Sequence, residues 1–261
     1  AGDRTGWNIK MLLYGASDTG KTYATSRLSE KYRTLILDVE GGHLSAPTDL
    51  PYADFTDIGE VVRLSDQYPS AMVKVDTWEQ TEQILAGLRR NPERFEVIVV
   101  DSLTELQKRC ADFVKSKQTT VIKELDTLTQ QGWGSLFEKF RALIRGYRDL
   151  RSHIVFTALE QYETDDQVGT TRWMPYLDGK KVPFEVVGWM DIVGHAIKKE
   201  QRNQDGTTDV KRIFRFVSNG REEAKVRGGF LNQEEEPDLV RIFEKVLGGE
   251  KNGNSSNVQQ G

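Results

Sequence analysis

The chain has 261 residues, which is enough for one large domain or two small ones. Hydrophobic residues make up 37% and charged residues 29%, and the formal net charge is −4, so the composition is that of a globular protein without an overall attraction to nucleic acid. The single cysteine, Cys110, excludes a disulfide framework and fits a reducing compartment. No signal-peptide segment and no apolar run near the ~18 residues of a membrane span is present. We therefore expect a cytoplasmic protein with no membrane partner.

Apolar segments rich in Val, Ile and Leu alternate with helical patterns over the first 160 residues. The predicted strands cover residues 9–14, 34–39, 95–101 and 153–159. The predicted helices cover residues 20–31, 77–90, 103–115 and 134–150. Short buried strands that alternate with amphipathic helices favour an α/β fold, with a mainly parallel sheet covered by helices on both faces.

The pattern changes after residue 160. A polar segment, 160–181, predicts a long loop or hairpin, and apolar segments at 189–199 and 210–218 flank the turn signal Asp205-Gly206. These features predict a C-terminal antiparallel extension, followed by a last helix at 237–247. The resulting division is an N-terminal arm (1–7), one domain (8–247) and a disordered tail (248–261).

The segment between the first predicted strand and helix fits the phosphate-binding pattern G-x-x-x-x-G-K-[ST]. Its glycines let backbone N–H groups face phosphate oxygens, and the helix N-terminus adds partial positive charge. We expect Lys21 to reach the terminal phosphates and Thr22 to place a hydroxyl on Mg²⁺. The predicted nucleotide-binding residues are Gly15, Ala16, Ser17, Asp18, Thr19, Gly20, Lys21, Thr22 and Tyr23.

Two acidic residues follow buried strands. Asp101 ends the strand at 95–101, where a P-loop protein needs a carboxylate for Mg²⁺, and the adjacent Ser102 either helps to position the metal or caps the next helix. Glu40 follows the strand at 34–39 and precedes two glycines. Its place at the carboxyl end of a strand suits a base that activates water beside the γ-phosphate, although a solvated turn residue is the plain alternative.

Three segments together resemble the RecA-like recombinase ATPases: GASDTGKT at 15–22, a strand ending in D-x-E-G at 38–41, and VIVVDS at 97–102. The pattern DxEGG at 38–42, the pair Trp133-Gly134 and the strand IVFTAL at 154–159 are similar to the small phage-encoded members that act as single-strand annealing proteins. The resemblance implies a RecA-like fold, ATP and Mg²⁺ as cofactors, and Glu40 as the catalytic base. It also implies self-assembly into a ring or filament in a bacterial host cytoplasm.

The same resemblance suggests roles for residues after the fourth core strand. A γ-phosphate sensor is expected there, with Gln161 as the candidate and Glu160 or Thr157 as alternatives. Lys198 and Lys199 are candidates for contacting ATP bound by the next subunit, although exposed lysines on an edge strand would look the same. His43 and His195 have no metal-ligand spacing, and we assign them no chemistry.

The resemblance also implies contacts with DNA from two loops, at about 116–132 and 160–181. The second holds residues suited to phosphate contact and base stacking, namely Arg172, Trp173, Lys180 and Lys181. Its acidic residues oppose a purely charge-driven site, and Trp173 could instead pack on the core.

The sequence thus predicts an ATPase of weak or DNA-stimulated activity that acts on single-stranded DNA in homologous recombination or strand annealing. Its predicted partners are single-stranded DNA, further copies of itself and a single-strand DNA-binding protein. The alternatives are a P-loop enzyme of another class, such as a small-molecule kinase, or a DNA-binding module that uses ATP only as a structural ligand.

Overall fold

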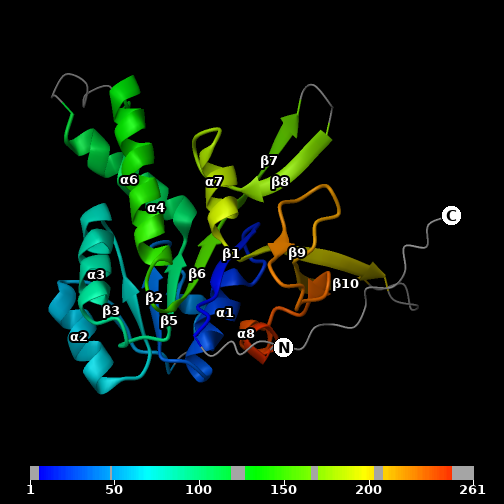
Figure 1. The fold of residues 1–261 in the computed structure, drawn as a ribbon, viewed down its shortest axis with the longest axis horizontal. Coiled ribbons are helices and arrows are strands. Elements are labelled where there is room, and N and C mark those ends of the chain that lie inside the picture. The colour runs from blue at the N-terminus through cyan, green and yellow to red at the C-terminus, as the bar shows by residue number, and fades with distance from the viewer. Residues whose placement is uncertain (1–5, 48, 119–126, 166–169, 203–207, 249–261) are drawn as a thin grey trace.

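The computed structural model describes residues 6–47, 49–118, 127–165, 170–202 and 208–248. A ten-stranded sheet crosses the described part of the chain, in the order β12-β10-β9-β1-β6-β5-β2-β4-β3, with β11 paired to β9 (Figure 1). Its strands are β1 (Lys10–Gly15), β2 (Thr34–Asp38), β3 (Tyr52–Asp54), β4 (Ala71–Lys74), β5 (Val97–Asp101), β6 (His153–Ala158), β9 (Ile192–Arg202), β10 (Thr208–Arg215), β11 (Lys225–Val226) and β12 (Glu234–Glu235).

The sheet is mainly parallel, because β1 to β6 and β9 all pair in parallel. The antiparallel pairs of this sheet join β10 and β11 to β9, and β12 to β10, at its C-terminal end. A separate hairpin of β7 (Glu160–Asp165) and β8 (Thr170–Pro175) projects away from the sheet (Figure 1). The predicted α/β class, a mainly parallel sheet with a C-terminal antiparallel extension, is confirmed.

Helices cover both faces of the sheet. One face packs against α2 (Ile58–Gln67), α3 (Trp78–Arg90), α4 (Leu103–Ser116), α6 (Gln130–Arg148) and α7 (Val182–Trp189). The other face packs against α1 (Lys21–Ser26), the 3₁₀ turn η1 (Arg27–Glu30) and α8 (Leu239–Gly248). Strand β1 is apolar along its length because both of its faces are buried. Leu12 and Tyr14 enter one core, and Met11 and Leu13 enter the other. None of the described helices is long and apolar enough to cross a membrane.

Local sequence explains where several helices begin and end. Thr77 and Gln80 form a reciprocal capping box at the start of α3, and the Ser102 hydroxyl caps α4. The first helix is shorter than predicted: α1 ends at Ser26 and continues as a 3₁₀ turn, where Ser26 and Ser29 hydroxyls donate to backbone carbonyls three residues earlier. Such side-chain bonds compete with regular helix geometry.

Most predicted strands and helices lie within a few residues of the observed ones, but the sequence interpretation named no element between residues 43 and 76. The structure places β3, α2, β4 and the short 3₁₀ turn η2 (His43–Ser45) there. Their segments are short, and β3 is partly exposed at the sheet edge, so apolar periodicity gives little signal. The predicted Asp205-Gly206 turn and nearly all of the predicted tail lie outside the described residues.

Candidate functional site

The phosphate-binding loop joins the end of β1 to the start of α1, as the motif requires. Gly15 is the last residue of β1 and pairs with Ala196 of β9. A side chain at position 15 would place its Cβ 2.2 Å from the Ala196 carbonyl oxygen, so only glycine fits there. Gly20 precedes α1 with φ of 89°, a backbone conformation that favours glycine. The two glycines therefore serve close strand packing and a left-handed turn.

Lys21 is buried, and its ammonium group points into the loop. Its Nζ donates to the carbonyl oxygens of Gly15 and Ala16, each over 2.8 Å. Burial lowers the pKa of Lys21, while the nearby carboxylates of Asp101, Glu40 and Glu160 oppose the shift. A buried ammonium surrounded by loop backbone can transfer these hydrogen bonds to a phosphate that enters the loop.

Asp101 lies at the end of β5, separated from the P-loop strand by β6. It is fully buried, and its two carboxylate oxygens have different partners. The Thr22 hydroxyl donates to Oδ2 over 2.6 Å, and the hydroxyl of Thr157, on the intervening β6, donates to Oδ1. Burial raises the pKa of Asp101, and the two hydroxyl donors act in the opposite direction. The fold thus brings Thr22 and Asp101, the predicted metal residues, into direct contact.

The chemistry of this pair fits Mg²⁺. One carboxylate and one hydroxyl are hard oxygen ligands, and Mg²⁺ in nucleotide sites is held by one or two such groups together with phosphates and water. No group of three or more His, Cys, Asp or Glu side chains that could hold a metal ion occurs in the described ranges.

Glu40 follows β2, the strand beside β5, and its side chain is exposed at the end of the sheet. Buried Asp38 shapes this turn, because its Oδ1 accepts hydrogen bonds from Gly41 N (2.7 Å) and Gly42 N (2.9 Å). A Cβ at Gly42 would lie 3.2 Å from the Thr22 methyl carbon, so the turn packs closely on the P-loop helix. The D-x-E-G pattern therefore places an acidic side chain beside the P-loop.

These elements enclose one open cleft of about 580 Å³. Its lining residues come from the P-loop, the start of α1, the Glu40 turn and β10, and they are Ser17, Asp18, Gly20, Lys21, Thr22, Tyr23, Glu40, Gly41, Gly42, Ser45 and Arg212. An ammonium group, a hydroxyl and a free carboxylate thus face one space, which is the set of groups that hydrolysis of a bound nucleoside triphosphate requires.

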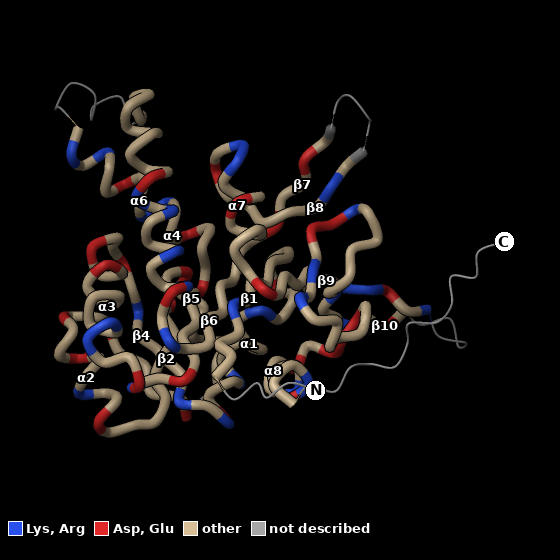
Figure 2. The backbone as a smooth tube through the Cα atoms, in the orientation of Figure 1, with Lys and Arg blue, Asp and Glu red and all other residues tan. Residues whose placement is uncertain are grey.

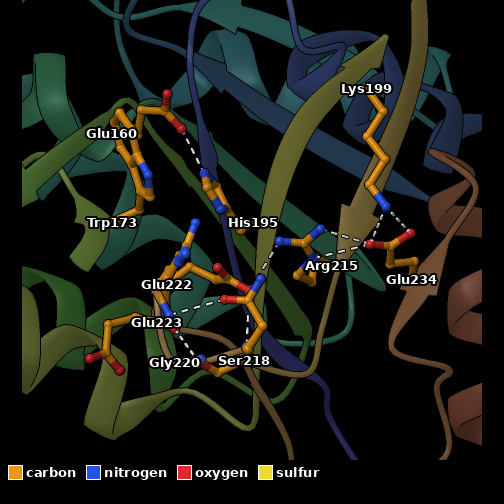
Figure 3. A network of polar contacts seen from close by, with 12 residues as sticks. Glu160, Trp173, His195, Lys199, Arg215, Ser218, Gly220, Glu222, Glu223 and Glu234 are labelled. Atoms are coloured by element: carbon orange, nitrogen blue, oxygen red, sulfur yellow. Dashed lines mark hydrogen bonds and ion pairs between the residues drawn. The ribbon is translucent and has the colours of Figure 1, made fainter. Parts of the chain in front are cut away.

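A second cleft, of about 500 Å³, lies on the other side of the P-loop, and the predicted sensor segment borders it. Glu160 Oε2 lies 2.6 Å from Nε2 of buried His195 (Figure 3). The His195 ring also stacks on Tyr14. Because successive strand side chains point to opposite faces, Gln161 points away from His195. The sensor role of Gln161 stays a prediction, and Glu160 is the better-placed alternative.

The structure places Lys198 and Lys199 on opposite faces of β9. Lys199 Nζ forms an ion pair with Glu234 over 2.6 Å (Figure 3). Lys198 Nζ lies 2.6 Å from Asp18 Oδ2 in the P-loop of its own chain. Lys198 reaches the P-loop of its own chain because β9 pairs directly with β1 and extends past its end. The contact of the two lysines with ATP bound by a neighbouring subunit stays a prediction.

Sequence reasoning missed Arg212, which lies on β10 and lines the nucleotide cleft. Its Nη2 lies 2.9 Å from Asp18 Oδ1, and its Nε donates to the Asp18 carbonyl oxygen. The segment 210–218 shows only strand periodicity and a basic residue at position 212. The contact depends on the pairing of β10 with β9, which no local pattern encodes.

The candidate DNA residues differ in their surroundings. Arg172 forms an ion pair with Glu223 over 2.7 Å, and half-buried Trp173 packs against the core. Lys180 and Lys181 are exposed just before α7. Basic and acidic residues mix along the β7–β8 hairpin and the loop before α7 (Figure 2). The other predicted loop, at about 116–132, runs from the last residue of α4 into the start of α6, and residues 119–126 of it lie outside the described residues.

Comparison with known proteins gives one family match. A family model described as an AAA domain matches residues 7–228. No curated protein matches the chain. Among solved structures, the flagellar accessory protein FlaH from Methanocaldococcus jannaschii is 10% identical, with 87% of this chain and 84% of FlaH covered and a TM-score of 0.42. The ATPase DotB of Legionella pneumophila is 9% identical, with 82% of this chain and 48% of DotB covered and a TM-score of 0.31.

Proposed function

The chain belongs to the AAA domain family, and from this premise we propose that it binds Mg²⁺-ATP, hydrolyses it with Glu40 as the base, and uses the reaction on single-stranded DNA. The observation that carries the nucleotide part is the contact of Thr22 with Asp101 beside Lys21. Strand annealing or another step of homologous recombination is the reaction class that we propose for the DNA.

Four side chains in and beside the cleft take part in this scheme. Lys21 and the loop N–H groups bind the phosphates. Thr22 and Asp101 would hold Mg²⁺, which would neutralise phosphate charge. Glu40 orients a water molecule and takes one of its protons as the water oxygen bonds to the γ-phosphorus. The bond from that phosphorus to the bridging oxygen breaks, and ADP leaves with the electron pair.

Exposed aromatic and basic side chains support the DNA part of the proposal. Lys180 and Lys181 precede α7, and the exposed aromatic residues nearby in the chain are Tyr162, Tyr176 and Phe184. The β7–β8 hairpin and α7 project from the same edge of the molecule (Figure 1). Basic groups that contact phosphates and aromatic rings that stack on bases are the usual elements of single-strand binding. Assembly with further copies of the chain, and contact with a single-strand DNA-binding protein, belong to the same proposal.

Phosphate release with and without single-stranded DNA tests the proposal, with annealing of complementary strands measured in the same samples. We expect release from ATP without any added acceptor, and stimulation by DNA that is lost in the double variant Lys180→Ala, Lys181→Ala. Release that requires an added small-molecule acceptor would instead indicate a kinase.

Glu40→Gln separates an ATPase from a module that uses ATP only as a ligand. Loss of annealing in this variant would show that turnover drives the function. Annealing that persists with ATP bound and unhydrolysed would favour binding alone and contradict the proposed role of hydrolysis.

A further inference from the structure

Asp18, at the tip of the P-loop, joins this loop to two cations from a distant part of the chain. Lys198 Nζ lies 2.6 Å from its Oδ2 and Arg212 Nη2 lies 2.9 Å from its Oδ1. Arg212 Nε also donates to the Asp18 backbone oxygen over 3.1 Å. The β9–β10 pair is thus attached to the phosphate-binding loop of its own chain. The hydrogen bond from Lys198, which has the largest effect, and that from Arg212 hold the pKa of Asp18 below its usual range.

The two cations lie side by side. Lys198 and Arg212 are direct partners in the β9–β10 register, so both side chains point to the same face of the sheet. Like charges at directly opposed strand positions repel one another and destabilise the pair. An anion between them relieves this repulsion, and Asp18 supplies a single carboxylate for two positive groups.

The contacts with Asp18 are exposed and therefore easily exchanged. The exposed side-chain fractions are 71% for Asp18, 45% for Arg212 and 37% for Lys198. Ion pairs in such surroundings contribute little to stability, because water and salt screen them. A ligand that offers more negative charge at the same place can displace the carboxylate at small cost.

Arg212 is already directed at the nucleotide cleft. It lines this cleft together with Lys21, Thr22 and Glu40. A Cβ at Gly20 would lie 3.4 Å from Arg212 Cδ, so the arginine stem passes directly over the loop. A polyphosphate cradled by the loop would carry several negative charges within reach of the guanidinium.

We infer that Asp18 is an internal substitute for a phosphate anion, which holds Arg212 and Lys198 and releases Arg212 to the polyphosphate of a nucleotide bound by the same chain. Arg212 is then a nucleotide-binding residue in cis, and the β9–β10 pair responds to occupancy of the cleft. The inference rests on the proposed function, because it requires that the cleft binds a nucleoside triphosphate.

The experiment measures the Kd of a fluorescent ATP analogue for wild type, Asp18→Asn, Arg212→Gln and the double variant. Asparagine tolerates the left-handed backbone of residue 18, whose φ is 58°, so the fold is retained. We expect Asp18→Asn to tighten binding about 3–10-fold and Arg212→Gln to weaken it about 10-fold, in line with the loss of one charge-assisted contact. In the Arg212→Gln background, Asp18→Asn should no longer tighten ATP binding. Asp18 competes with the nucleotide for the Arg212 guanidinium, so its removal has no effect once that group is absent.

Lys211→Gln is the matched control. Lys211 is the residue before Arg212, and its side chain lies on the opposite face of β10, where it pairs with Glu236, so the substitution removes one positive charge away from the cleft. It should bind ATP like wild type. Additive effects of Asp18→Asn and Arg212→Gln, or wild-type affinity of Arg212→Gln, would overturn the inference. A loss of ATP affinity in Arg212→Gln that appears only at high protein concentration would also overturn the inference, because it would place Arg212 at the nucleotide of a neighbouring subunit.

Lys21→Ala separates this inference from the proposed function. If wild type binds ATP and Lys21→Ala does not, the nucleotide site stands, and the behaviour of Arg212→Gln alone decides the inference. If wild type and Lys21→Ala both fail to bind ATP, the proposed function fails and the inference fails with it.

Discussion

The Thr22 hydroxyl donates a hydrogen bond to Asp101 Oδ2 over 2.6 Å, although the two residues are 79 positions apart in the chain. Strand β6 lies between β1, which leads into the P-loop, and β5, which ends at Asp101, and the Thr157 hydroxyl on β6 donates to the other oxygen of the same carboxylate. This contact joins the P-loop helix to the end of β5, and it positions the two groups that we propose as Mg²⁺ ligands.

Replacing Thr22 tests this role. We expect Thr22→Ser to keep the Mg²⁺ dependence of ATP binding, because serine retains the hydroxyl. Thr22→Val has nearly the same shape without the hydroxyl, and its ATP affinity in Mg²⁺ should fall to that seen with a chelator. The measurement is the Kd for ATP in Mg²⁺ and in EDTA, with thermal unfolding to confirm the fold. An unchanged Mg²⁺ enhancement in Thr22→Val would remove Thr22 from the metal site.

Lys21→Ala should nearly abolish ATP binding while the fold survives. The ammonium group donates to two loop carbonyls, and the side chain belongs to neither of the two core clusters. Loss of two charge-assisted hydrogen bonds of about 1.5–3 kcal/mol each weakens binding by about 100-fold or more. Isothermal titration and circular dichroism on the same sample check both parts. Near wild-type affinity in a folded Lys21→Ala protein would refute the P-loop assignment.

Acid should destabilise the fold through His153, a residue outside the candidate site. Its Nδ1 accepts a hydrogen bond from Ile9 N over 2.9 Å, and burial, with the nearby Lys10 charge, lowers the pKa of His153 to about 4. The unfolded chain therefore binds the proton more readily between pH 6.5 and 4, so stability present above pH 6.5 is lost as the pH falls. From pH 7 to pH 5 this amounts to about 2 kcal/mol.

The matched variant is His153→Gln, whose amide oxygen can accept from Ile9 N without titrating. Urea unfolding at pH 7 and pH 5 should show a smaller loss of stability in the variant than in wild type, by about 2 kcal/mol. Equal losses in the two proteins would show that His153 is not the titrating group.

The sequence predicted the fold and the proposed nucleotide residues where the signal is local. The glycine spacing around Lys21, the buried run before Asp101 and the pattern around Glu40 are each contained in a few consecutive residues. The remaining contacts of the site depend on strand pairing, which no short stretch of sequence encodes. The placement of Lys198 and Arg212 at Asp18 depends on β9 lying beside β1 and β10 beside β9. The pairing of Glu160 with His195 likewise joins segments 35 residues apart.

Glu40 is an exposed carboxylate that lines the cleft beside the P-loop, and in the proposed function it is the residue that distinguishes ATP hydrolysis from ATP binding alone. The most direct measurement is phosphate release from Mg²⁺-ATP by wild type and Glu40→Gln, with the ATP Kd of each and exposed Glu93→Gln as the control. We predict that Glu40→Gln binds ATP with a Kd within about 3-fold of wild type. Its rate of phosphate release should be lower by a factor of about 100 or more, as expected for loss of a general base. Wild-type turnover by Glu40→Gln would contradict the account and make Glu160 the next candidate for the base.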